Sequence, residues 1–320
     1  MSVPVEGVRI GLDVGGTKIA GVALAPDGEI IARTRRATGW GAVAVIRGIA
    51  EAAQDLAAQA GAAAGQIRSI GVGIPGLVDA DAGRVLHAVN LGVESLDVGP
   101  QVRALLNAPC HVENDVKAAA LGAAALHGDR EPMAYLNIGT GVAAGIVIDG
   151  RIWRGARGTA GEVGHLVVDP GGRLCGCGQR GCIETLCGGG AIARAWARGG
   201  AFPVRDVLDA ADAGEEAAIA LRDDLARGVS AAVRALVLSV DVERVVIGGG
   251  LTALADRIEP RIRQALRDDA AESPFLLSLG LDERIELLPA SSPVSAIGAA
   301  LLGADVAQHT PLEKEIIAHG

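Results

Sequence analysis

Four potential metal ligands are gathered near the middle of this sequence of 320 residues. Cys175, Cys177 and Cys182 fall within one short glycine-rich segment, and His165 lies just before it. Three thiolates and one imidazole form a complete tetrahedral ligand set for zinc, and the intervening glycines let a short loop fold back around one ion. A disulfide or a group of buried free thiols is the alternative interpretation. Zinc with four protein ligands keeps no open coordination position, so we expect a structural metal ion.

Two carboxylates flank this cysteine segment. Glu162 lies shortly before His165, and Glu184 lies shortly after Cys182. A histidine that binds a metal through one ring nitrogen can form a hydrogen bond with the other, and the metal fixes its tautomer. A zinc-bound His165 flanked by two carboxylates would therefore present rigid polar groups that suit sugar hydroxyls. Each glutamate could alternatively be an ordinary surface charge.

Length and composition limit what can surround these residues. A chain of 320 residues predicts two domains. Half of the residues are hydrophobic but only 2% are aromatic, so the core must consist of Val, Ile, Leu and Ala packed closely at glycines. The net charge of -9 argues against a nucleic-acid-binding surface. There is no secretory signal and no apolar run that suits a membrane span, so we expect a cytoplasmic protein without a nucleic-acid or membrane partner.

Strand-like and helix-like segments together predict an α/β fold. Runs of apolar and β-branched residues bounded by turns predict strands, and Ala-rich runs with helical spacing predict helices. Strands are expected at residues 8–14, 19–24, 29–35, 69–74, 110–112, 134–138, 142–148, 244–247 and 285–288, with another beginning at 151–154. Helices are expected at residues 43–63, 116–126, 189–198, 204–211, 215–238, 254–268 and 295–306.

Two glycine hairpins indicate a weak internal duplication. Asp13-Val-Gly-Gly-Thr17 and Asn137-Ile-Gly-Thr-Gly141 each stand between two strand-like runs. Such hairpins can present backbone N–H groups to one polyphosphate. A doubly wound dinucleotide-binding fold is the competing interpretation, but Gly15-Gly16 leads into a strand-like run rather than a helix, and the three-glycine spacing is absent.

Seven motifs taken in order resemble one known family, the ROK family, which groups bacterial sugar kinases with sugar-responsive repressors. They are Asp13-Val-Gly-Gly-Thr-Lys18, Gly73-Ile-Pro-Gly76, Asn114-Asp115, Gly139-Thr-Gly141, Glu162-Val-Gly-His165, Cys175-Gly-Cys-Gly-Gln-Arg-Gly-Cys182 and Gly248-Gly-Gly-Leu251. The resemblance covers essentially the whole chain, and its cysteine motif is the most specific. It implies the actin/hexokinase-like ATPase fold, an α/β fold in which two similar domains flank a cleft. The domains would be residues 1–115 plus 294–320, and residues 116–293 with the zinc loop.

The resemblance implies that Asp115 is the catalytic base, which would take the proton from the attacking sugar hydroxyl. The alternative is that Asn114 and Asp115 only cap the following helix. Asp13 matches the acidic residue near magnesium, although it could also be an ordinary turn aspartate.

The other implied site residues form three groups. The sugar ligands would be Gly76, Asn90, Asn114, Asp115, Glu162, His165 and Glu184. ATP would bind to Asp13, Gly15, Gly16, Thr17 and Lys18, to Gly139, Thr140 and Gly141, and near its adenosine to Gly248, Gly249 and Gly250. Structural zinc would bind to His165, Cys175, Cys177 and Cys182. A glycine run after a strand could also be only a tight turn, and Lys18 only a solvated lysine.

Three positions depart from the family's pattern. Lys117 stands where a small or amide residue is common, Ala143-Ala144 replaces a commoner glycine pair, and Cys187 follows Glu184 where Ala-Ser is frequent. None of these removes a proposed catalytic group. Cys110 and Cys187 lie outside the zinc spacing, and we expect both to be small buried hydrophobic residues.

The sequence therefore predicts an ATP-dependent kinase that uses Mg²⁺ and phosphorylates a hexose hydroxyl, with glucose as the first candidate. Asn90-Leu91-Gly92 resembles a segment of the family's glucose kinases, although Val93 replaces the tryptophan that often follows it. N-acetylglucosamine or N-acetylmannosamine is the alternative substrate. A non-catalytic sugar sensor or repressor relative is disfavoured, because too few residues precede the first hairpin for a DNA-binding domain. A homodimer is the expected assembly.

Overall fold

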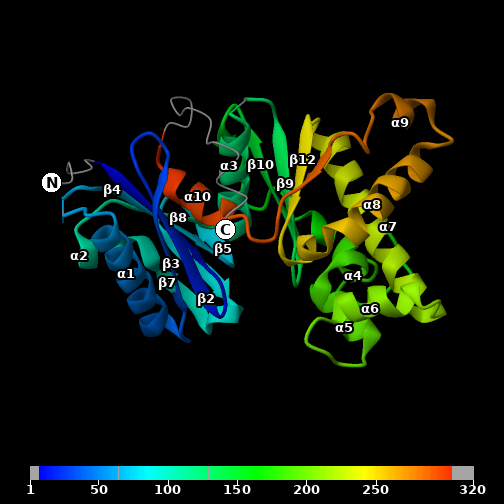
Figure 1. Ribbon diagram of the computed structural model, residues 1–320, viewed down its shortest axis with the longest axis horizontal. Coiled ribbons are helices and arrows are strands. Elements are labelled where there is room, and N and C mark those ends of the chain that lie inside the picture. Colours follow the sequence, from blue (N-terminus) through cyan, green and yellow to red (C-terminus); the bar gives the residue numbers. More distant parts are fainter. Residues whose placement is uncertain (1–6, 64, 129, 305–320) are drawn as a thin grey trace. The chain divides into compact units, whose positions relative to one another are not determined.

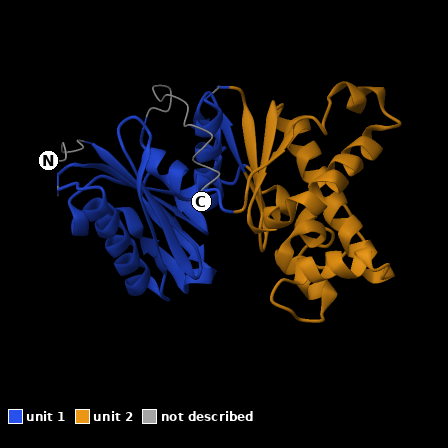
Figure 2. Ribbon diagram, viewed as in Figure 1, with its two compact units in different colours: residues 1–130, 145–160, 291–320 blue, residues 131–144, 161–290 orange. Residues whose placement is uncertain are grey.

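The chain folds into two compact α/β units. The computed structural model describes residues 7–63, 65–128 and 130–304 (Figure 1). Of these, the residues within 1–130, 145–160 and 291–320 form unit 1, and those within 131–144 and 161–290 form unit 2 (Figure 2). This division differs from the expected one after residue 115, because helix α3 (Asp115–His127) packs against helix α10 (Val294–Leu301) within unit 1.

Unit 1 is built on a five-stranded sheet with the strand order β3-β2-β1-β4-β8. The strands are β1 (Val8–Val14), β2 (Lys18–Leu24), β3 (Ile30–Ala37), β4 (Ile67–Ile74) and β8 (Cys110–Asn114). The hairpins β1–β2 and β2–β3 are antiparallel, whereas β4 runs parallel to both β1 and β8. Helix α1 (Ala42–Gln59) packs against β1, β2 and β3, and the buried residues of α1 and these strands form one apolar core.

Glycines let helix α10 lie directly on this sheet. A Cβ atom at Gly71 would lie 1.7 Å from the carbonyl oxygen of Ala299, and one at Gly11 would lie 1.9 Å from that of Ala296. The contact of α10 with α3 is equally close, since a Cβ atom at Gly122 would lie 2.0 Å from the carbonyl oxygen of Val294. This packing agrees with the expected core of small and aliphatic residues.

A small second sheet in unit 1 has no counterpart among the predicted elements. Its strands, in the order β5-β6-β7, are β5 (Leu77–Asp79), β6 (Arg84–Ala88) and β7 (Val93–Asp97). The 3₁₀ turn η1 (Val89–Leu91) and helix α2 (Val98–Leu106) complete this region. The strands are short and partly exposed, so their apolar residues form no run long enough to predict a strand.

The second five-stranded sheet repeats the first, with the order β11-β10-β9-β12-β13. Its strands are β9 (Met133–Ile138), β10 (Val142–Ile148), β11 (Arg151–Ile152), β12 (Arg244–Gly248) and β13 (Ile285–Leu287). Strands β9, β12 and β13 are parallel, as are β1, β4 and β8. In both sheets a glycine hairpin joins the first strand of the repeat to the second. The predicted internal duplication is therefore confirmed.

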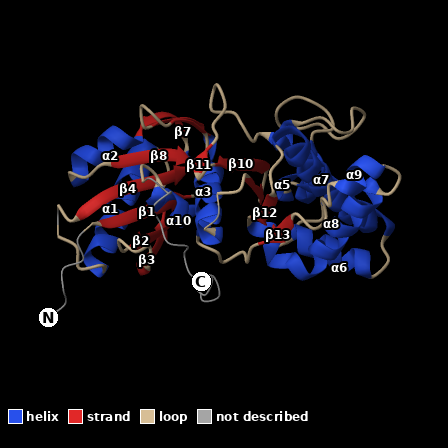
Figure 3. Cartoon of the chain, turned by 90° about the horizontal axis from the view of Figure 1, so that it is seen from above, coloured by secondary structure: helices blue, strands red, loops and turns tan. Residues whose placement is uncertain are grey.

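Helices form most of the chain between residues 183 and 278 (Figure 3). They are α4 (Ile183–Cys187), α5 (Gly189–Trp196), α6 (Pro203–Asp212), α7 (Glu216–Val240), α8 (Ala255–Ala270) and α9 (Pro274–Ser278). The predicted helices match α5 to α8, whereas α4 and α9 are too short for a periodic pattern. Helix α10 ends at Leu301, before its expected end at Val306, which lies outside the described residues. Among the described residues, no helix is long and apolar enough to cross a membrane.

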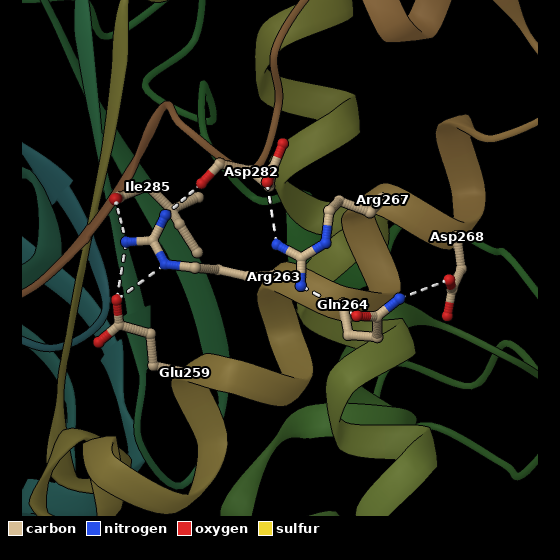
Figure 4. Close-up of polar contacts among 7 residues, drawn as sticks. All are labelled: Glu259, Arg263, Gln264, Arg267, Asp268, Asp282 and Ile285. Carbon is tan, nitrogen blue, oxygen red and sulfur yellow. Dashed lines mark hydrogen bonds and ion pairs between the residues drawn. The ribbon is translucent and has the colours of Figure 1, made fainter.

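Polar contacts of helix α8 hold the segment that leads into β13 (Figure 4). Arg263 binds Glu259 one turn earlier, the carbonyl oxygen of Asp282, and the carbonyl oxygen of Ile285 at 3.0 Å. Arg267 donates a hydrogen bond to the carboxylate of Asp282 at 3.1 Å. The parallel edge strand β13 is thus fixed to the helix that follows β12.

Candidate functional site

Asn114 and Asp115 lie where strand β8 passes into helix α3. Asn114 caps the helix, because its Oδ1 accepts hydrogen bonds from the N–H groups of Val116 (3.1 Å) and Lys117 (3.2 Å). Its Nδ2 donates to the carbonyl oxygen of Gly76 at 3.3 Å. Asp115, the first residue of the helix, is half-buried. Asn114 therefore makes the cap, and Asp115 Oδ1 also accepts a hydrogen bond from the Val116 N–H at 2.9 Å.

Gly76 contacts this junction from the end of β4. Its φ angle of +118° is one that L side chains rarely adopt, and a Cβ atom there would lie 2.8 Å from the carbonyl oxygen of Leu86. Only glycine suits this position. The structure thus brings Gly76, Asn114 and Asp115 together, as the sequence predicts for part of a sugar site.

Asp13 lies beside Asp115 at the end of strand β1. Asp13 is in register with Gly73 on β4, and a Cβ atom at Gly73 would lie 3.5 Å from the Cα atom of Asp115. Burial, followed by the negative charge of Asp115, raises the pKa of Asp13 to about 7, and Lys18 opposes the shift. A cation at this position would reverse the unfavourable burial and repulsion. Asp13 therefore fits a magnesium ion bound nearby.

The first glycine hairpin presents an exposed turn beside Asp13. The turn is closed by a hydrogen bond from the Gly15 N–H to the carbonyl oxygen of Lys18 at 2.9 Å, and the hydroxyl of Thr38 donates to the Gly15 carbonyl oxygen at 2.6 Å. Gly16, Thr17 and Lys18 are exposed. An exposed, backbone-rich turn of this kind can bind phosphate oxygens.

Asn90 lies next to this turn. A Cβ atom at Gly16 would lie 3.2 Å from the carbonyl oxygen of Asn90, which belongs to the 3₁₀ turn η1. The side chain of Asn90 is exposed. The predicted sugar ligand Asn90 and the predicted phosphate-binding Gly16 are therefore neighbours within unit 1.

In unit 2 the four predicted metal ligands form one cluster. One ligand atom from each of His165, Cys175, Cys177 and Cys182 lies within 4.8 Å of the others. The Sγ atoms of Cys177 and Cys182 are 3.7 Å apart, and Cys175 Sγ is also 3.7 Å from His165 Nδ1. A tetrahedral site with Zn–S bonds of about 2.3 Å has sulfur atoms about 3.8 Å apart. The cluster thus fits zinc, and these four residues would hold it.

The protonation of the cysteines also suits a cation. Hydrogen bonds from the backbone and then the side chain of Gln179 lower the pKa of Cys177 to about 6. Desolvation, followed by the neighbouring thiols Cys177 and Cys175, raises the pKa of Cys182 to about 12. One thiolate therefore forms easily, whereas a second is opposed by its neighbour. A divalent metal would remove that repulsion and allow several thiolates together.

Glu184, on helix α4, connects the cysteine cluster to the second glycine hairpin. Its Oε2 accepts a hydrogen bond from the Val142 N–H at 3.0 Å, and its Oε1 lies 3.9 Å from Cys175 Sγ. A Cβ atom at Gly141 would lie 2.6 Å from Glu184 Oε2, so a larger residue there would displace the Glu184 carboxylate. The Glu184 carboxylate is therefore fixed beside both the predicted zinc site and the predicted phosphate-binding hairpin.

Glu162 and His165 stand at the two ends of one short 3₁₀ turn. Glu162 precedes the turn η2 (Val163–His165), and the His165 N–H donates to the Glu162 carbonyl oxygen at 3.2 Å. The Glu162 side chain is exposed. His165 faces Cys175 with Nδ1, so a metal bound there would leave Nε2 for a hydrogen bond with another group.

The second glycine hairpin is bound to the start of helix α5. The carbonyl oxygen of Gly139 accepts from the Gly189 N–H at 2.8 Å, and that of Thr140 accepts from the Gly190 N–H at 2.9 Å. A Cβ atom at Gly189 would lie only 2.9 Å from the Gly139 oxygen. Gly189 and Gly190 were not predicted as site residues, although the run of three glycines at the start of α5 was a possible signal.

The three glycines that end and follow strand β12 differ in why glycine is present at each position. A Cβ atom at Gly248 would lie 2.2 Å from the Tyr135 hydroxyl, and Gly249 has a φ angle of +95°. Gly250 is exposed, with open space around its Cα atom. Close packing requires Gly248, and turn geometry requires Gly249. Gly250 has no such constraint and is the member of the run that is open to a ligand.

The two remaining cysteines are buried apolar residues, as predicted. Cys110 is 4% exposed, and burial raises its pKa to about 12. Cys187 is fully buried, and burial followed by the charge of Glu184 raises its pKa well above the usual range. Neither thiol belongs to the metal cluster.

Comparisons with known proteins agree with this arrangement. Residues 9–305 match the family model described as "ROK family". A glucokinase of Halalkalibacterium halodurans is 33% identical over 277 residues, which are 80% of this chain and 84% of that protein. An N-acetylmannosamine kinase of Yersinia pseudotuberculosis is 32% identical over 249 residues, 77% of this chain and 83% of that one. A ROK family glucokinase from Streptomyces griseus, solved in complex with glucose and AMPPNP, superposes with a TM-score of 0.72 at 28% identity, covering 92% of this chain and 99% of that one.

Proposed function

The chain belongs to the ROK family, and we propose that it transfers the terminal phosphoryl group of ATP to a hydroxyl of glucose. That it is an ATP-dependent sugar kinase with the actin/hexokinase-like ATPase fold follows from its kinase relatives and its glucokinase neighbour. Glucose as the preferred sugar is our proposal. One observation supports this chemistry. Asp115, the candidate for the catalytic base, lies beside Asp13, a half-buried residue whose pKa is raised to about 7.

Asp115 is proposed as the general base. Phosphoryl transfer asks the protein mainly to position the reactants and stabilise charge, and a base takes the hydroxyl proton as the oxygen bonds to phosphorus. The Asn114 cap and the strand–helix junction fix the backbone of Asp115. The proton passes from the sugar hydroxyl to the Asp115 carboxylate, and the new O–P bond replaces the bond to ADP.

Asp13 and the two glycine hairpins are proposed to bind the donor. Gly15, Gly16, Thr17 and Lys18 would contact phosphate oxygens, as would Gly139, Thr140 and Gly141, with Gly248, Gly249 and Gly250 near the adenosine. Asp13 would help to hold Mg²⁺, which would supply positive charge to offset the negative charge that develops on the phosphate oxygens. The raised pKa of Asp13 supports a cation beside it, because its carboxylate has repulsion and burial to relieve.

The remaining predicted residues are proposed to recognise the sugar. Glu162, His165 and Glu184 would bind hydroxyls, with Gly76, Asn90 and Asn114 completing the set. Glu184 is already oriented by its bond to the Val142 N–H, and His165 would be oriented by zinc. A zinc ion with four protein ligands supplies rigidity and no reaction step.

Glucose is preferred over N-acetylmannosamine on one local feature. The glucokinase and the N-acetylmannosamine kinase relatives are 33% and 32% identical, so identity alone does not separate the sugars. The segment Asn90-Leu91-Gly92, which resembles that of glucose kinases, lies against Gly16. This placement supports a role for Asn90 in the active site.

Three further expectations stay with the proposal. The kinase is proposed to act in the cytoplasm, to act without nucleic acid, and to form a homodimer. Size-exclusion chromatography with light scattering tests the dimer. A DNA-binding assay tests whether the chain has kept the repressor activity that other members of this family have.

The function is tested by measuring ADP release with glucose, mannose, N-acetylglucosamine and N-acetylmannosamine, each with Mg²⁺ and ATP. We expect the highest kcat/KM with glucose. A higher value with N-acetylmannosamine would reject glucose as the preferred sugar but would still agree with sugar kinase activity. Sugar-independent ATP hydrolysis alone, or no turnover, would reject the kinase proposal for this panel. Replacing ATP by polyphosphate tests the donor.

A further inference from the structure

Two buried charges lie on either side of Asp115 in the sequence. Glu113, on β8, is 2% exposed, and Lys117, in the first turn of α3, is 4% exposed. Burial of a charged group is costly unless an opposite charge or hydrogen bonds compensate it. Each of these side chains must therefore have a contact that holds it in place, and the proposed chemistry uses neither of them.

Both charges bind the same loop, residues 153–160, which follows strand β11. Arg154 Nε donates to Glu113 Oε2 at 2.6 Å, and Lys117 Nζ donates to the carbonyl oxygen of Gly158 at 2.8 Å. The loop is closed on itself by the Ala160 N–H, which donates to the carbonyl oxygen of Arg154 at 3.2 Å. The junction that carries Asp115 thus anchors this loop at two points.

The anchor at Lys117 is specific in its geometry. Gly158 has a φ angle of +76°, which L side chains rarely adopt. Strand β10 lies directly on the first turn of α3, since a Cβ atom at Gly145 would lie 3.0 Å from the Lys117 Cα atom. Lys117 is also one of only three lysines in the chain, which otherwise uses arginine for its positive charges. A slim ammonium group with a carbonyl partner suits this closely packed place.

The loop leads directly into the segment with the proposed sugar ligand Glu162. Its last residue is Ala160, and the next residue, Gly161, is held to strand β10 by a hydrogen bond from the Ala144 N–H at 2.7 Å. A Cβ atom at Gly161 would lie 1.9 Å from the Ala144 carbonyl oxygen, so this segment cannot shift without breaking its contact. The path of the chain into Glu162 is therefore fixed on both sides of Ala160.

We propose that Lys117 is a positioning residue for sugar binding. By holding Gly158, it fixes the loop that leads into Glu162, and it does so from the same helical turn that carries Asp115. The Glu113–Arg154 pair is the second anchor of the loop. Lys117 touches no substrate in this role and acts through the main chain. This inference rests on the proposed function, because it assigns Glu162 to the sugar.

Lys117→Met tests the proposal. Methionine fills a similar volume and removes the buried charge together with one hydrogen bond, so the melting temperature should change by only a few degrees. The KM for the sugar should rise about tenfold or more, while the KM for ATP stays within about twofold, because a displaced ligand loses binding energy at one substrate only. Hydrogen–deuterium exchange of peptides covering residues 153–160, measured without substrates, should become faster. Arg151→Met, which removes an exposed cation from the adjoining strand β11, is the matched control and should change none of these.

The outcomes separate this inference from the proposed function. An unchanged sugar KM with unchanged exchange would overturn the role of Lys117, even in an active kinase. Equal rises in both KM values with a lower melting temperature would also overturn it, because they indicate general loosening. If the wild-type chain phosphorylates no sugar in the panel, the proposed function fails. The exchange experiment would then still decide whether Lys117 anchors the loop, and unchanged exchange would reject the anchor as well.

Discussion

Asp13 and Asp115 lie on either side of Gly73, and the charge of Asp115 helps to raise the pKa of Asp13 to about 7. Gly73 lies between them, and a Cβ atom there would lie 3.5 Å from the Asp115 Cα atom, so the end of β1 and the start of α3 are close together. Two nearby carboxylates in different surroundings can take different roles. Here the half-buried Asp13 suits a cation, and Asp115 suits proton transfer.

The first prediction concerns pH and the stability of the metal-free chain. An aspartate normally titrates near pH 4, so between about pH 4 and pH 7 the folded state binds a proton at Asp13 that the unfolded state does not. The contribution of Asp13 to stability is therefore present at low pH and is lost as pH rises to about 7. Asp13→Asn should remove this loss. Urea unfolding is measured from pH 5 to pH 8 in the presence of a chelator. The free energy of unfolding of the variant should increase relative to that of the wild type as pH rises. Parallel curves would contradict the prediction.

The second prediction concerns the base. Asp115→Asn keeps the size of the side chain but cannot accept the hydroxyl proton. General-base catalysis contributes about 10²–10⁴-fold, so kcat should fall by that order. Asn114 makes the helix cap, and an asparagine side chain can still accept the hydrogen bond that Asp115 accepts from the Val116 N–H. The melting temperature and the sugar dissociation constant should therefore change little. Stopped assays of ADP and calorimetric titration of sugar check these values. Turnover close to that of the wild type would require another base.

The comparison of Asp115 with Gly189 shows what the sequence could and could not predict. Asp115, the glycine hairpins and the cysteine cluster stand in short, recognisable sequence motifs. The helices and strands around them were predicted with small errors at their ends. The duplication predicted two similar halves, and the two five-stranded sheets have corresponding strand orders. The contact of Gly189 with Gly139 and the bond of Lys117 to Gly158 join segments distant in the sequence. No local pattern encodes such contacts, because they depend on how helices and loops pack.

Short exposed elements were missed for a related reason. The sheet β5-β6-β7 and helices α4 and α9 have few apolar residues each, so the surrounding fold determines their conformation more than their own sequence does. Asn90 was identified only through the family resemblance, and its position beside Gly16 became visible only in the folded chain.

The third prediction concerns the metal. Purified protein should contain one zinc ion per chain, measured by elemental analysis, and Cys177→Ser should lower this content. Loss of one thiolate should loosen the loop that orients His165 and Glu184, so the KM for sugar should rise while nucleotide affinity is kept. Cys110→Ser is the control, because Cys110 is buried away from the cluster. Full activity in protein without metal would contradict the structural role of zinc.

The fourth prediction concerns the contact of the second glycine hairpin with helix α5. A Cβ atom at Gly189 would lie 2.9 Å from the carbonyl oxygen of Gly139, closer than real Cβ contacts, so Gly189→Ala should displace the hairpin. If Gly139, Thr140 and Gly141 bind phosphate, the KM for ATP should rise several-fold, because a small displacement of a positioning group is costly. The KM for sugar should change less. Gly171→Ala is the matched control, since a Cβ atom there would have its nearest neighbour at 3.8 Å. Steady-state kinetics with each substrate varied in turn gives both constants. An unchanged ATP KM in a folded Gly189→Ala variant would remove the hairpin from the phosphate site, whereas the same rise in Gly171→Ala would show that the effect is not local.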